Sequence, residues 1–215
     1  MDAARIAQLL QPFAPPLDDS QLQHISIYID ILLRWNARIN LTAVREPEAI
    51  VTRHFGESLF AATRLFPLDS ASSGKPKVVD VGSGAGFPGL PIKIWAPQIH
   101  LSLIESNHKK ATFLREITRN LRLTDVDVFA GRADDFPPAS AAVVTLRAVE
   151  RFAAALPTAA DLVHPAGRIA LLVGQGQIAS AKEVVPSFAW GEPISVPRSS
   201  SRVLLIGKRT GEESV

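Results

Sequence analysis

Apolar residues in the first third of the chain recur every three or four positions, which is the period of an amphipathic helix. A first helix is predicted to begin after Asp18-Asp19-Ser20, because these residue types cap helix N-termini, and to end before Asn40. A second is predicted to begin at Pro47, because proline suits the first helical turn. The apolar stripes of the two helices are Leu22, Ile25, Ile29, Leu32 and Leu33, and then Val51, Phe55, Leu59, Ala62 and Phe66.

The pattern changes after residues 67–76, a segment rich in serine, alanine and glycine that we interpret as a linker. Short runs of β-branched residues then alternate with helical segments. This alternation indicates βαβ units with a parallel sheet. The predicted strands are Val78–Val81, Leu101–Glu105, Val126–Phe129, Val143–Val149 and Ile169–Val173, and the clearest helix between them is Asn107–Leu121.

Two further strands, Ile194–Val196 and Arg202–Gly207, have no helix between them, so they are expected to form a closing hairpin. The sequence therefore predicts an α/β fold whose mixed sheet contains one antiparallel strand. We expect residues 1–70 to form a helical N-terminal part and residues 71–215 to form the α/β part, packed together as one compact unit.

The composition is that of a globular protein, with 47% hydrophobic and 20% charged residues among 215. There are no cysteines, which excludes disulfides, cysteine-ligated metals and a cysteine nucleophile, and which fits a cytoplasmic protein. The longest nearly apolar run, Ile25–Leu33, falls short of the roughly 20 residues that a membrane helix needs. No signal-peptide pattern opens the chain. We therefore expect a cytoplasmic location and no membrane partner.

The formal net charge is only +2, and the excess lies in residues 78–125, with six basic against four acidic side chains. A protein that binds a polyanion concentrates its charge in this way. An excess of two also falls within chance, so charge alone identifies no partner.

A glycine-rich segment, Asp80 to Gly89, follows the first predicted strand and opens a helix. Glycines allow a tight turn close to a ligand, and a helix N-terminus offers free N–H groups. In open α/β sheets, ligands bind at the carboxyl ends of the strands. Glu105 ends the next strand, where its carboxylate can accept both hydroxyls of a ribose. The segment therefore predicts a nucleoside cofactor.

Two cofactors compete for this segment. Gly84, Gly86 and Gly89 match the dinucleotide fingerprint. The spacing of Asp80, Gly82, Gly84 and Gly86 is instead the loop pattern of S-adenosylmethionine (SAM) methyltransferases. Asp80 would be poorly placed beside a pyrophosphate dianion but well placed near a cationic ligand. We therefore favour SAM, bound by Asp80, Gly82, Gly84, Gly86 and Glu105, and keep a dinucleotide as the alternative.

Together with the motifs around it, this loop resembles the 16S ribosomal RNA (guanine-N7) methyltransferases, also called the glucose-inhibited division protein B family. The resemblance covers nearly the whole chain. It rests on Trp35-Asn36, Asn40-Leu41-Thr42, Arg53-His54, Glu57-Ser58, Asp80 to Gly89, Lys109-Lys110, Phe113-Leu114 and Arg147-Ala148.

The resemblance implies a class I, Rossmann-like methyltransferase fold, with a seven-stranded sheet behind a helical N-terminal part. It implies transfer of a methyl group from SAM to N7 of a guanine, with 16S ribosomal RNA or the small ribosomal subunit as partner and no metal. Matched by position, the SAM-binding residues are Gly82, Phe87, Ala133, Asp134 and Arg147.

The residue types agree with these places. Asp134 follows the third strand, where a carboxylate can accept from an adenine amino group and Ala133 can offer its N–H; the alternative for Asp134 is an exposed loop acid. Phe87 either covers the cofactor or packs under the helix. Arg147 lies within an apolar strand, where burial without a partner is costly. We therefore expect Arg147 at the cleft as the catalytic residue, with a core anchor as the alternative.

Guanine N7 keeps a lone pair in the neutral base, so the protein needs to align an in-line displacement but needs no general base. The residues that are missing agree with this chemistry. Methylation at pyrimidine C5 normally uses a cysteine, and methylation of an exocyclic amine usually shows an Asn/Asp-Pro-Pro-aromatic motif after the fourth strand. Thr145-Leu146-Arg147-Ala148 stands there instead. Arg147 can donate to guanine O6 or to phosphate.

On the helix Asn107–Leu121 and its end, His108, Arg115, Arg119 and Arg122 fall on one side, either as phosphate contacts or as a solvated face. His54 is either a substrate-side residue or a structural histidine, and Trp35 is expected in the core. The candidate RNA-contacting residues are Asn40, Arg53, His54, Arg115, Arg119, Arg122 and Arg132.

Two positions depart from the family pattern: Val173 stands where a lysine is usual, and Glu57 where an aspartate is usual. Two rival functions stay open. One is a methyltransferase of the same fold that acts on a small molecule. The other is a SAM-binding regulatory or assembly protein without catalysis, for which Val173 is the only hint.

Overall fold

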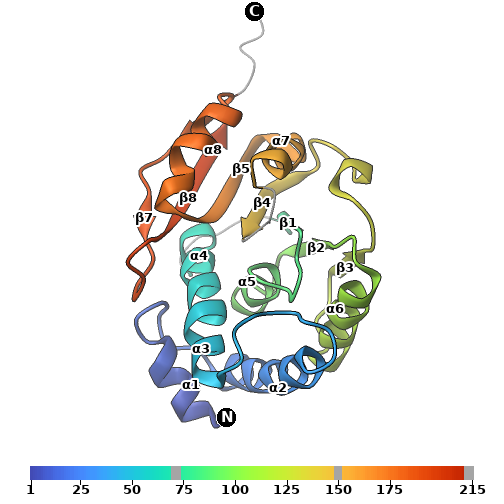
Figure 1. The fold of residues 1–215 in the computed structure, drawn as a ribbon, viewed down its shortest axis with the longest axis vertical. Coiled ribbons are helices and arrows are strands. Elements are labelled where there is room, and N and C mark those ends of the chain that lie inside the picture. The colour runs from blue at the N-terminus through green and yellow to red at the C-terminus, as the bar shows by residue number, and fades with distance from the viewer. Residues whose placement is uncertain (69–73, 148–151, 211–215) are drawn as a thin grey trace, which may run out of the picture.

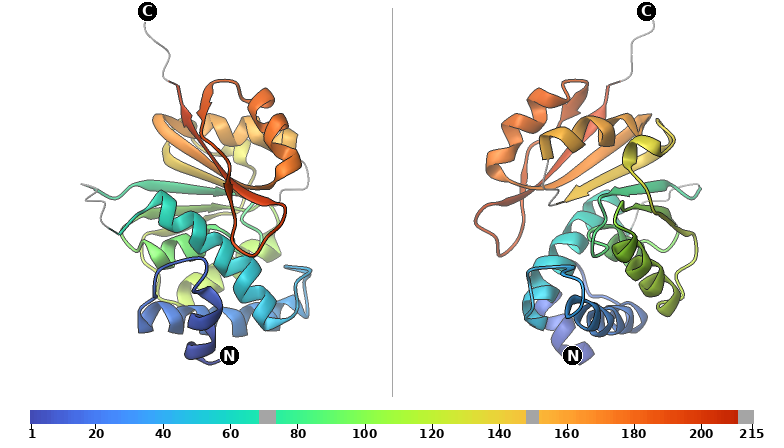
Figure 2. Two further views of the ribbon diagram at one scale, coloured as in Figure 1. Left: turned by 90° about the vertical axis from the view of Figure 1, so that its left-hand side faces the viewer. Right: turned by 45° about the vertical axis from the view of Figure 1, so that its right-hand side comes forward.

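The computed structural model describes residues 1–68, 74–147 and 152–210. A central sheet has helices on both of its faces (Figures 1 and 2). The sheet contains eight strands in the order β3-β2-β1-β4-β5-β8-β6, with β7 also paired to β8. The strands are Lys77–Val81 (β1), His100–Ile104 (β2), Val126–Phe129 (β3), Ala141–Arg147 (β4), Val163–Gly174 (β5), Phe188–Trp190 (β6), Ile194–Ser195 (β7) and Arg202–Arg209 (β8).

The five strands β1 to β5 pair in parallel, β8 pairs with β5 antiparallel, and β6 and β7 pair with β8 antiparallel. Seven strands thus form the main path of the sheet, and β8 alone runs against the others. This confirms the predicted mixed sheet, and β7 with β8 forms the expected hairpin. The short β6 was missed, because three residues show too little alternation to predict a strand.

Neighbouring residues on the strands face opposite sides of the sheet, and this alternation builds two cores. Val78, Leu101 and Leu103 belong to the core beneath the N-terminal helices. Val79 and Ile104 belong to the core on the other face, beneath the helices that follow β4 and β5. The described helices are Ala3–Leu10 (α1), Asp19–Asn36 (α2), Pro47–Ile50 (α3), Glu57–Leu65 (α4), Gly89–Trp95 (α5), His108–Asn120 (α6), Phe152–Asp161 (α7) and Ile178–Val184 (α8).

Helix α2 begins as predicted, because Asp18 accepts from the N–H of Gln21 at 2.8 Å and the Gln21 side chain accepts from the N–H of Asp18 at 3.0 Å. The helix lies across α5 and α6 (Figure 1), and its buried residue Ile25 joins the same core as Leu101. The boundary expected near residue 70 falls in 69–73, outside the described residues, so the division into two parts stays a prediction. None of the described helices is both long and apolar enough to span a bilayer.

The second predicted helix is interrupted. Between α3 and α4, residues Val51–Gly56 form a π-helical turn (η1), so the run from 47 to 65 is helical throughout but locally wider. Gly56 permits this turn to pack closely, because a Cβ there would lie 2.8 Å from the ring of Phe13. Single π turns are often found at functional sites. This one contains Arg53 and His54.

Candidate active site

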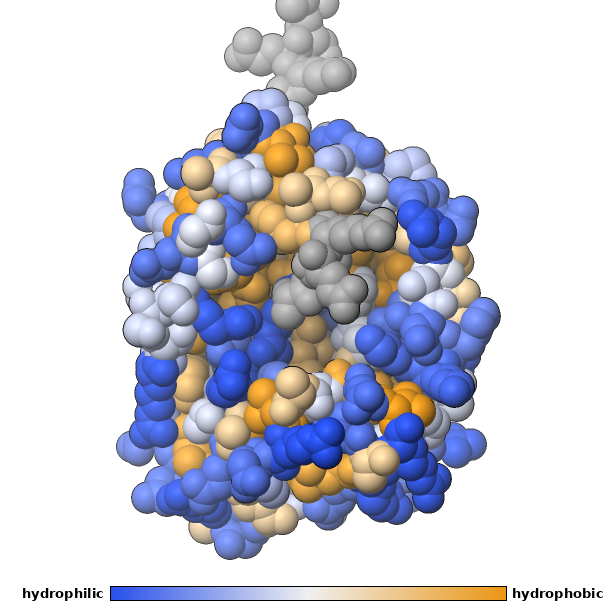
Figure 3. Space-filling view, in the orientation of Figure 1, coloured by the Kyte–Doolittle hydropathy of each residue, from blue (hydrophilic) through white to orange (hydrophobic). Residues whose placement is uncertain are grey.

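A cavity of about 800 Å³ lies where the order of the strands reverses, at the carboxyl ends of β1, β2 and β4. The loops after β1, β2 and β3 form one side of it, and Leu41, Thr42 and His54 from the N-terminal part form the other. In Figure 3 the surface is hollowed near the middle of the molecule, and hydrophilic side chains gather on both sides of the hollow. The cavity occupies the place where open α/β sheets bind ligands.

The glycine-rich loop after β1 has the left-handed backbone that its sequence predicts, with φ of 67° at Gly82, 55° at Gly84 and 87° at Gly86. Gly82 and Gly84 line the cavity. Gly86 instead packs against the protein interior, where a Cβ at this position would overlap the hydroxyl of Tyr28. That hydroxyl donates to the carbonyl of Ala85 and so ties the loop to α2.

We expect Gly86→Ala to lower the free energy of unfolding by about 2–4 kcal/mol, because it adds a left-handed alanine and an overlap in a packed region. The matched control is Gly84→Ala, which has the same backbone strain but only one atom within 4 Å, the carbonyl oxygen of Gly82 at 3.7 Å. Urea denaturation measures both. Equal losses in the two variants would show that the contact with Tyr28 does not limit this position.

Asp80, which the sequence analysis expected to bind the cofactor, lies beneath the loop. It is 1% exposed, does not line the cavity, and accepts from the hydroxyl of Thr145 at 2.6 Å and the N–H of Gly89 at 3.3 Å. Burial raises the pKa of Asp80 to about 6 although these hydrogen bonds oppose the rise. Through these two hydrogen bonds Asp80 connects β4 to the start of α5 and braces the glycine-rich loop.

Glu105 does line the cavity, at the end of β2. One oxygen accepts from the N–H of Gly84 and the other from the N–H of Asn107, each at 2.8 Å. An ionised carboxylate has about four positions for hydrogen bonds. Two of them are not used by any described residue.

The loop after β3 brings Arg132, Ala133 and Asp134 to the same wall. Asp134 accepts from the hydroxyl of Thr158 at 2.9 Å and from Arg132 at 3.1 Å. These two hydrogen bonds lower the pKa of the Asp134 carboxyl, with the Thr158 contact the larger cause. Asp134 is therefore an ionised acceptor at the cavity, and the sequence did not predict its partner Thr158.

Phe87 lies between the cavity and the core, and its role toward a cofactor stays a prediction. It lines the cavity, and its ring also stacks on Tyr28 with a centroid distance of 5.4 Å. Trp35 packs against Phe113 in the core, as predicted.

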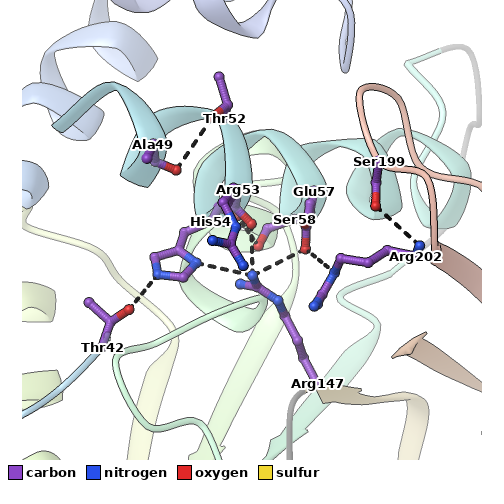
Figure 4. A network of polar contacts seen from close by, with 10 residues as sticks. All are labelled: Thr42, Ala49, Thr52, Arg53, His54, Glu57, Ser58, Arg147, Ser199 and Arg202. Carbon is purple, nitrogen blue, oxygen red and sulfur yellow. Dashed lines mark hydrogen bonds and ion pairs between the residues drawn. The ribbon is translucent and has the colours of Figure 1, made fainter. Parts of the chain in front are cut away.

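Arg147, at the end of β4, lines the cavity and contacts the π-helical turn and α4 through its Nη2 (Figure 4). Its Nη2 lies 2.7 Å from the carbonyl oxygen of Arg53, 3.0 Å from Nδ1 of His54 and 3.1 Å from Oε2 of Glu57. The side chain is 7% exposed, and burial lowers the pKa of Arg147 to about 10. The strand residue that seemed costly to bury thus has a carboxylate partner, Glu57, which the sequence analysis missed. Ala148 lies outside the described residues.

Glu57 serves two arginines at once. Its Oε2 also lies 2.9 Å from Nε of Arg202, from the start of β8, although that N–H does not point at the oxygen. One carboxylate between two guanidinium groups leaves this buried cluster with an excess of one positive charge. Among the described residues, Nε of Arg147 also has no hydrogen-bond partner. Val173, which stands where the family usually has a lysine, is 3% exposed in the core and does not line the cavity.

His54 lines the cavity between Arg147 and Thr42, whose hydroxyl oxygen lies 2.7 Å from its Nε2. Burial, followed by the charges of Arg147 and Arg53, lowers the pKa of His54 to about 3, so the ring is neutral at physiological pH. The side chains of Asn40 and Arg53 are exposed and do not line the cavity. Their role in RNA contact stays a prediction.

Two arginines of α6 and one that follows the helix come together as expected, but in a separate groove. Arg115, Arg119 and Arg122 line it together with Val126 and Val128 of β3. Helix α6 starts at the cavity, which its residue Lys110 lines, and runs back along the sheet toward this groove. Asp127 also lines the groove, and a role of the three arginines in RNA contact stays a prediction.

The family model for rRNA small subunit methyltransferase G (GidB) matches residues 21–195. A Roseiflexus sp. (strain RS-1) protein named ribosomal RNA small subunit methyltransferase G is 37% identical over 202 residues, which cover 88% of this chain and 84% of that protein. A protein of the same name from Alkaliphilus metalliredigens (strain QYMF) is 40% identical over 119 residues, which cover 55% of this chain and 48% of that protein. A solved SAM-dependent methyltransferase from Aquifex aeolicus matches 80% of this chain and 97% of its own, with a TM-score of 0.60 and 13% identity, and so shares its fold.

Proposed function

Because the chain belongs to the rRNA small subunit methyltransferase G (GidB) family, we propose that it transfers a methyl group from SAM to N7 of a guanine in 16S ribosomal RNA. Family membership confirms the resemblance seen in the motifs. The proposal rests on one observation: a single cavity is lined by the glycine loop, by the two carboxylates Glu105 and Asp134, and by Arg147 with the neutral His54. A ribosomal substrate also implies a cytoplasmic enzyme, which is the location that we propose.

The first side of the cavity fits SAM. Glu105 has two open acceptor positions for the ribose, and Asp134 is an ionised acceptor for the adenine amino group. Gly84 leaves the loop open toward the cavity, since its nearest neighbour would be 3.7 Å from a Cβ. When bound, SAM supplies an electrophilic methyl group on a sulfonium centre. Gly82, Phe87, Ala133 and Arg147 line the same cavity and complete the set expected to hold it.

The second side fits a reaction without a general base. N7 attacks with the lone pair of the neutral base, so the residues only have to hold guanine in line with the methyl group. His54 is neutral and both of its ring nitrogens are engaged, by Arg147 and by Thr42. It therefore positions its neighbours and takes no proton from the substrate.

The test is methyl transfer from labelled SAM to 16S RNA, or to small ribosomal subunits from a strain that lacks the enzyme. Label in a guanine of the RNA supports the proposal, and label in a small molecule alone supports the first rival. Calorimetry completes the test. Binding of SAM without transfer to any substrate would support a regulatory protein, and binding of NAD without SAM would support the dinucleotide alternative.

The single-turnover rate should be nearly flat from about pH 7 to 9, because N7 of the neutral base attacks without losing a proton and needs no general base. The pKa values of His54, Asp80 and Arg147 are about 3, 6 and 10. Because folding raises the pKa of Asp80, the proton on this carboxyl stabilises the folded protein at a pH below the pKa of the unfolded state. This stabilisation is lost as the pH rises through about 6, so it does not change between pH 7 and 9. A steep rise in rate between pH 7 and 9 would contradict a mechanism without a base.

Alanine at Arg115, Arg119 and Arg122 together should weaken RNA binding and flatten its dependence on salt, because each phosphate contact releases counterions. SAM affinity should stay the same. The matched control removes three exposed cations from other elements, Lys182, Arg198 and Lys208. An unchanged salt slope in the arginine variant, measured by filter binding, would identify the groove as a solvated face.

A further inference from the structure

Thr42 is held in place by residues of α2 and η1. The sequence analysis named Asn40, from the same motif, as the candidate RNA contact. The Thr42 backbone is fixed by the buried side chain of Asn36, at the end of α2. The Asn36 oxygen accepts from the N–H groups of Leu41 and Thr42 at 2.8 and 2.9 Å, and its amide nitrogen donates to the carbonyl of Thr42 at 3.0 Å. Thr42 lines the cavity beside His54.

Figure 4 shows a series of polar contacts from Glu57 through Arg147 and His54 to the Thr42 hydroxyl. Nη2 of Arg147 has two hydrogens, which it shares among the carbonyl oxygen of Arg53, Oε2 of Glu57 and Nδ1 of His54, the last at 3.0 Å. In the tautomer whose Nδ1 accepts this contact, the neutral ring has its hydrogen on Nε2 and donates to Oγ1 of Thr42 at 2.7 Å.

A second donor reaches the same oxygen: the N–H of Val44, at 3.1 Å. A hydroxyl has two acceptor positions and one hydrogen, and both acceptor positions of Thr42 are thus used. Its hydrogen has no acceptor among the described residues. An ordinary threonine can donate or accept, but this one is restricted to donating into the cavity.

We propose that the Thr42 hydroxyl donates a hydrogen bond to O6 of the target guanine and thereby selects guanine over adenine. The inference rests on the proposed function. On the edge of the base that contains N7, guanine has the acceptor O6 where adenine has an amino donor. Adenine would place its donor against the Thr42 hydrogen, whereas guanine accepts from it and keeps the N7 lone pair free.

The experiment is a double-mutant cycle between enzyme and substrate. Thr42→Val removes the hydroxyl, and 2-aminopurine at the target position of the RNA removes O6 but keeps N7. With guanine RNA, Thr42→Val should lower kcat/KM about tenfold. With 2-aminopurine RNA the same substitution should change it less than twofold, because the bond is already absent.

Three controls separate recognition from folding. Thr42→Ser should recover most of the rate on guanine RNA. Thr52→Val changes a threonine of η1 whose hydroxyl donates only to backbone carbonyls of α3, and it should leave the rate unchanged. Thermal melting verifies that each variant is folded, and Thr42→Ala replaces Thr42→Val in the cycle if the valine variant is not.

Each other result overturns the assignment. Equal losses on the two RNAs would show that the hydroxyl does not act on O6. Weaker SAM binding by the folded variant in calorimetry would place the acceptor on the cofactor instead. If wild-type enzyme fails to methylate guanine RNA at all, the proposed function itself is wrong, and this inference is wrong with it.

Discussion

Replacing Glu57 by alanine is expected to lower the free energy of unfolding by about 3–5 kcal/mol, the usual loss when one partner of a buried ion pair is removed. Arg147 and Arg202 both depend on this carboxylate, at 3.1 and 2.9 Å. Without it, two guanidinium groups would face each other in a region where Arg147 is 7% exposed. Urea denaturation measures the loss.

The matched control for Glu57 is Glu48→Ala, which breaks an ion pair with Arg5 at the surface. Those two side chains are 55% and 40% exposed, so solvent replaces the partner and little change is expected. Losses of similar size in the two variants would contradict the view that burial makes Glu57 important.

Arg147→Ala should behave in the opposite way, with a rate about 100-fold lower and only a modest loss of stability. Glu57 keeps Arg202 as its partner in this variant, so no uncompensated carboxylate is left. The rate falls because Arg147 fixes the ring of His54 and lines the cavity. Arg147→Lys should recover only part of the rate, since a point charge does not replace a planar group with several donors.

Single-turnover rates and thermal melts, measured on the same samples, decide between this role and a core anchor. Arg64→Ala serves as the control, because Arg64 packs on Phe60 of α4 and does not line the cavity. If Arg147→Ala melts as early as Glu57→Ala and keeps its rate when folded, Arg147 is a core anchor after all.

The parts of the fold that the sequence predicted depend on local patterns. Alternating runs of β-branched residues mark β1 to β4 within a few positions, and the glycines after β1 predict a left-handed turn because few other residues adopt one. Glu105 and Asp134 were placed correctly at the cavity, because each follows a strand whose carboxyl end faces it.

What the sequence could not predict depends on contacts between distant segments. Glu57 and Arg147 are 90 positions apart, and only the paired strands bring them together. The π turn at Val51–Gly56 shifts the helical period over too few residues to disturb the apolar stripe. The sequence analysis expected the Asp80 side chain to face the cavity, because the residue belongs to the glycine-loop motif. The side chain instead accepts a hydrogen bond from Thr145 of β4, a contact that the motif does not predict.

The place of Arg202 in the chain also bears on how the protein is made. Strand β8 lies between β5 and β6 in the sheet. During synthesis, one edge of β5 therefore stays unpaired until β8 has been translated. A nascent chain that has reached α8 already contains every residue that lines the cavity, yet it lacks the second cation beside Glu57. Before β8 is translated, Glu57 and Arg147 form a pair without net charge, and the excess positive charge next to the cavity arises only when Arg202 joins them.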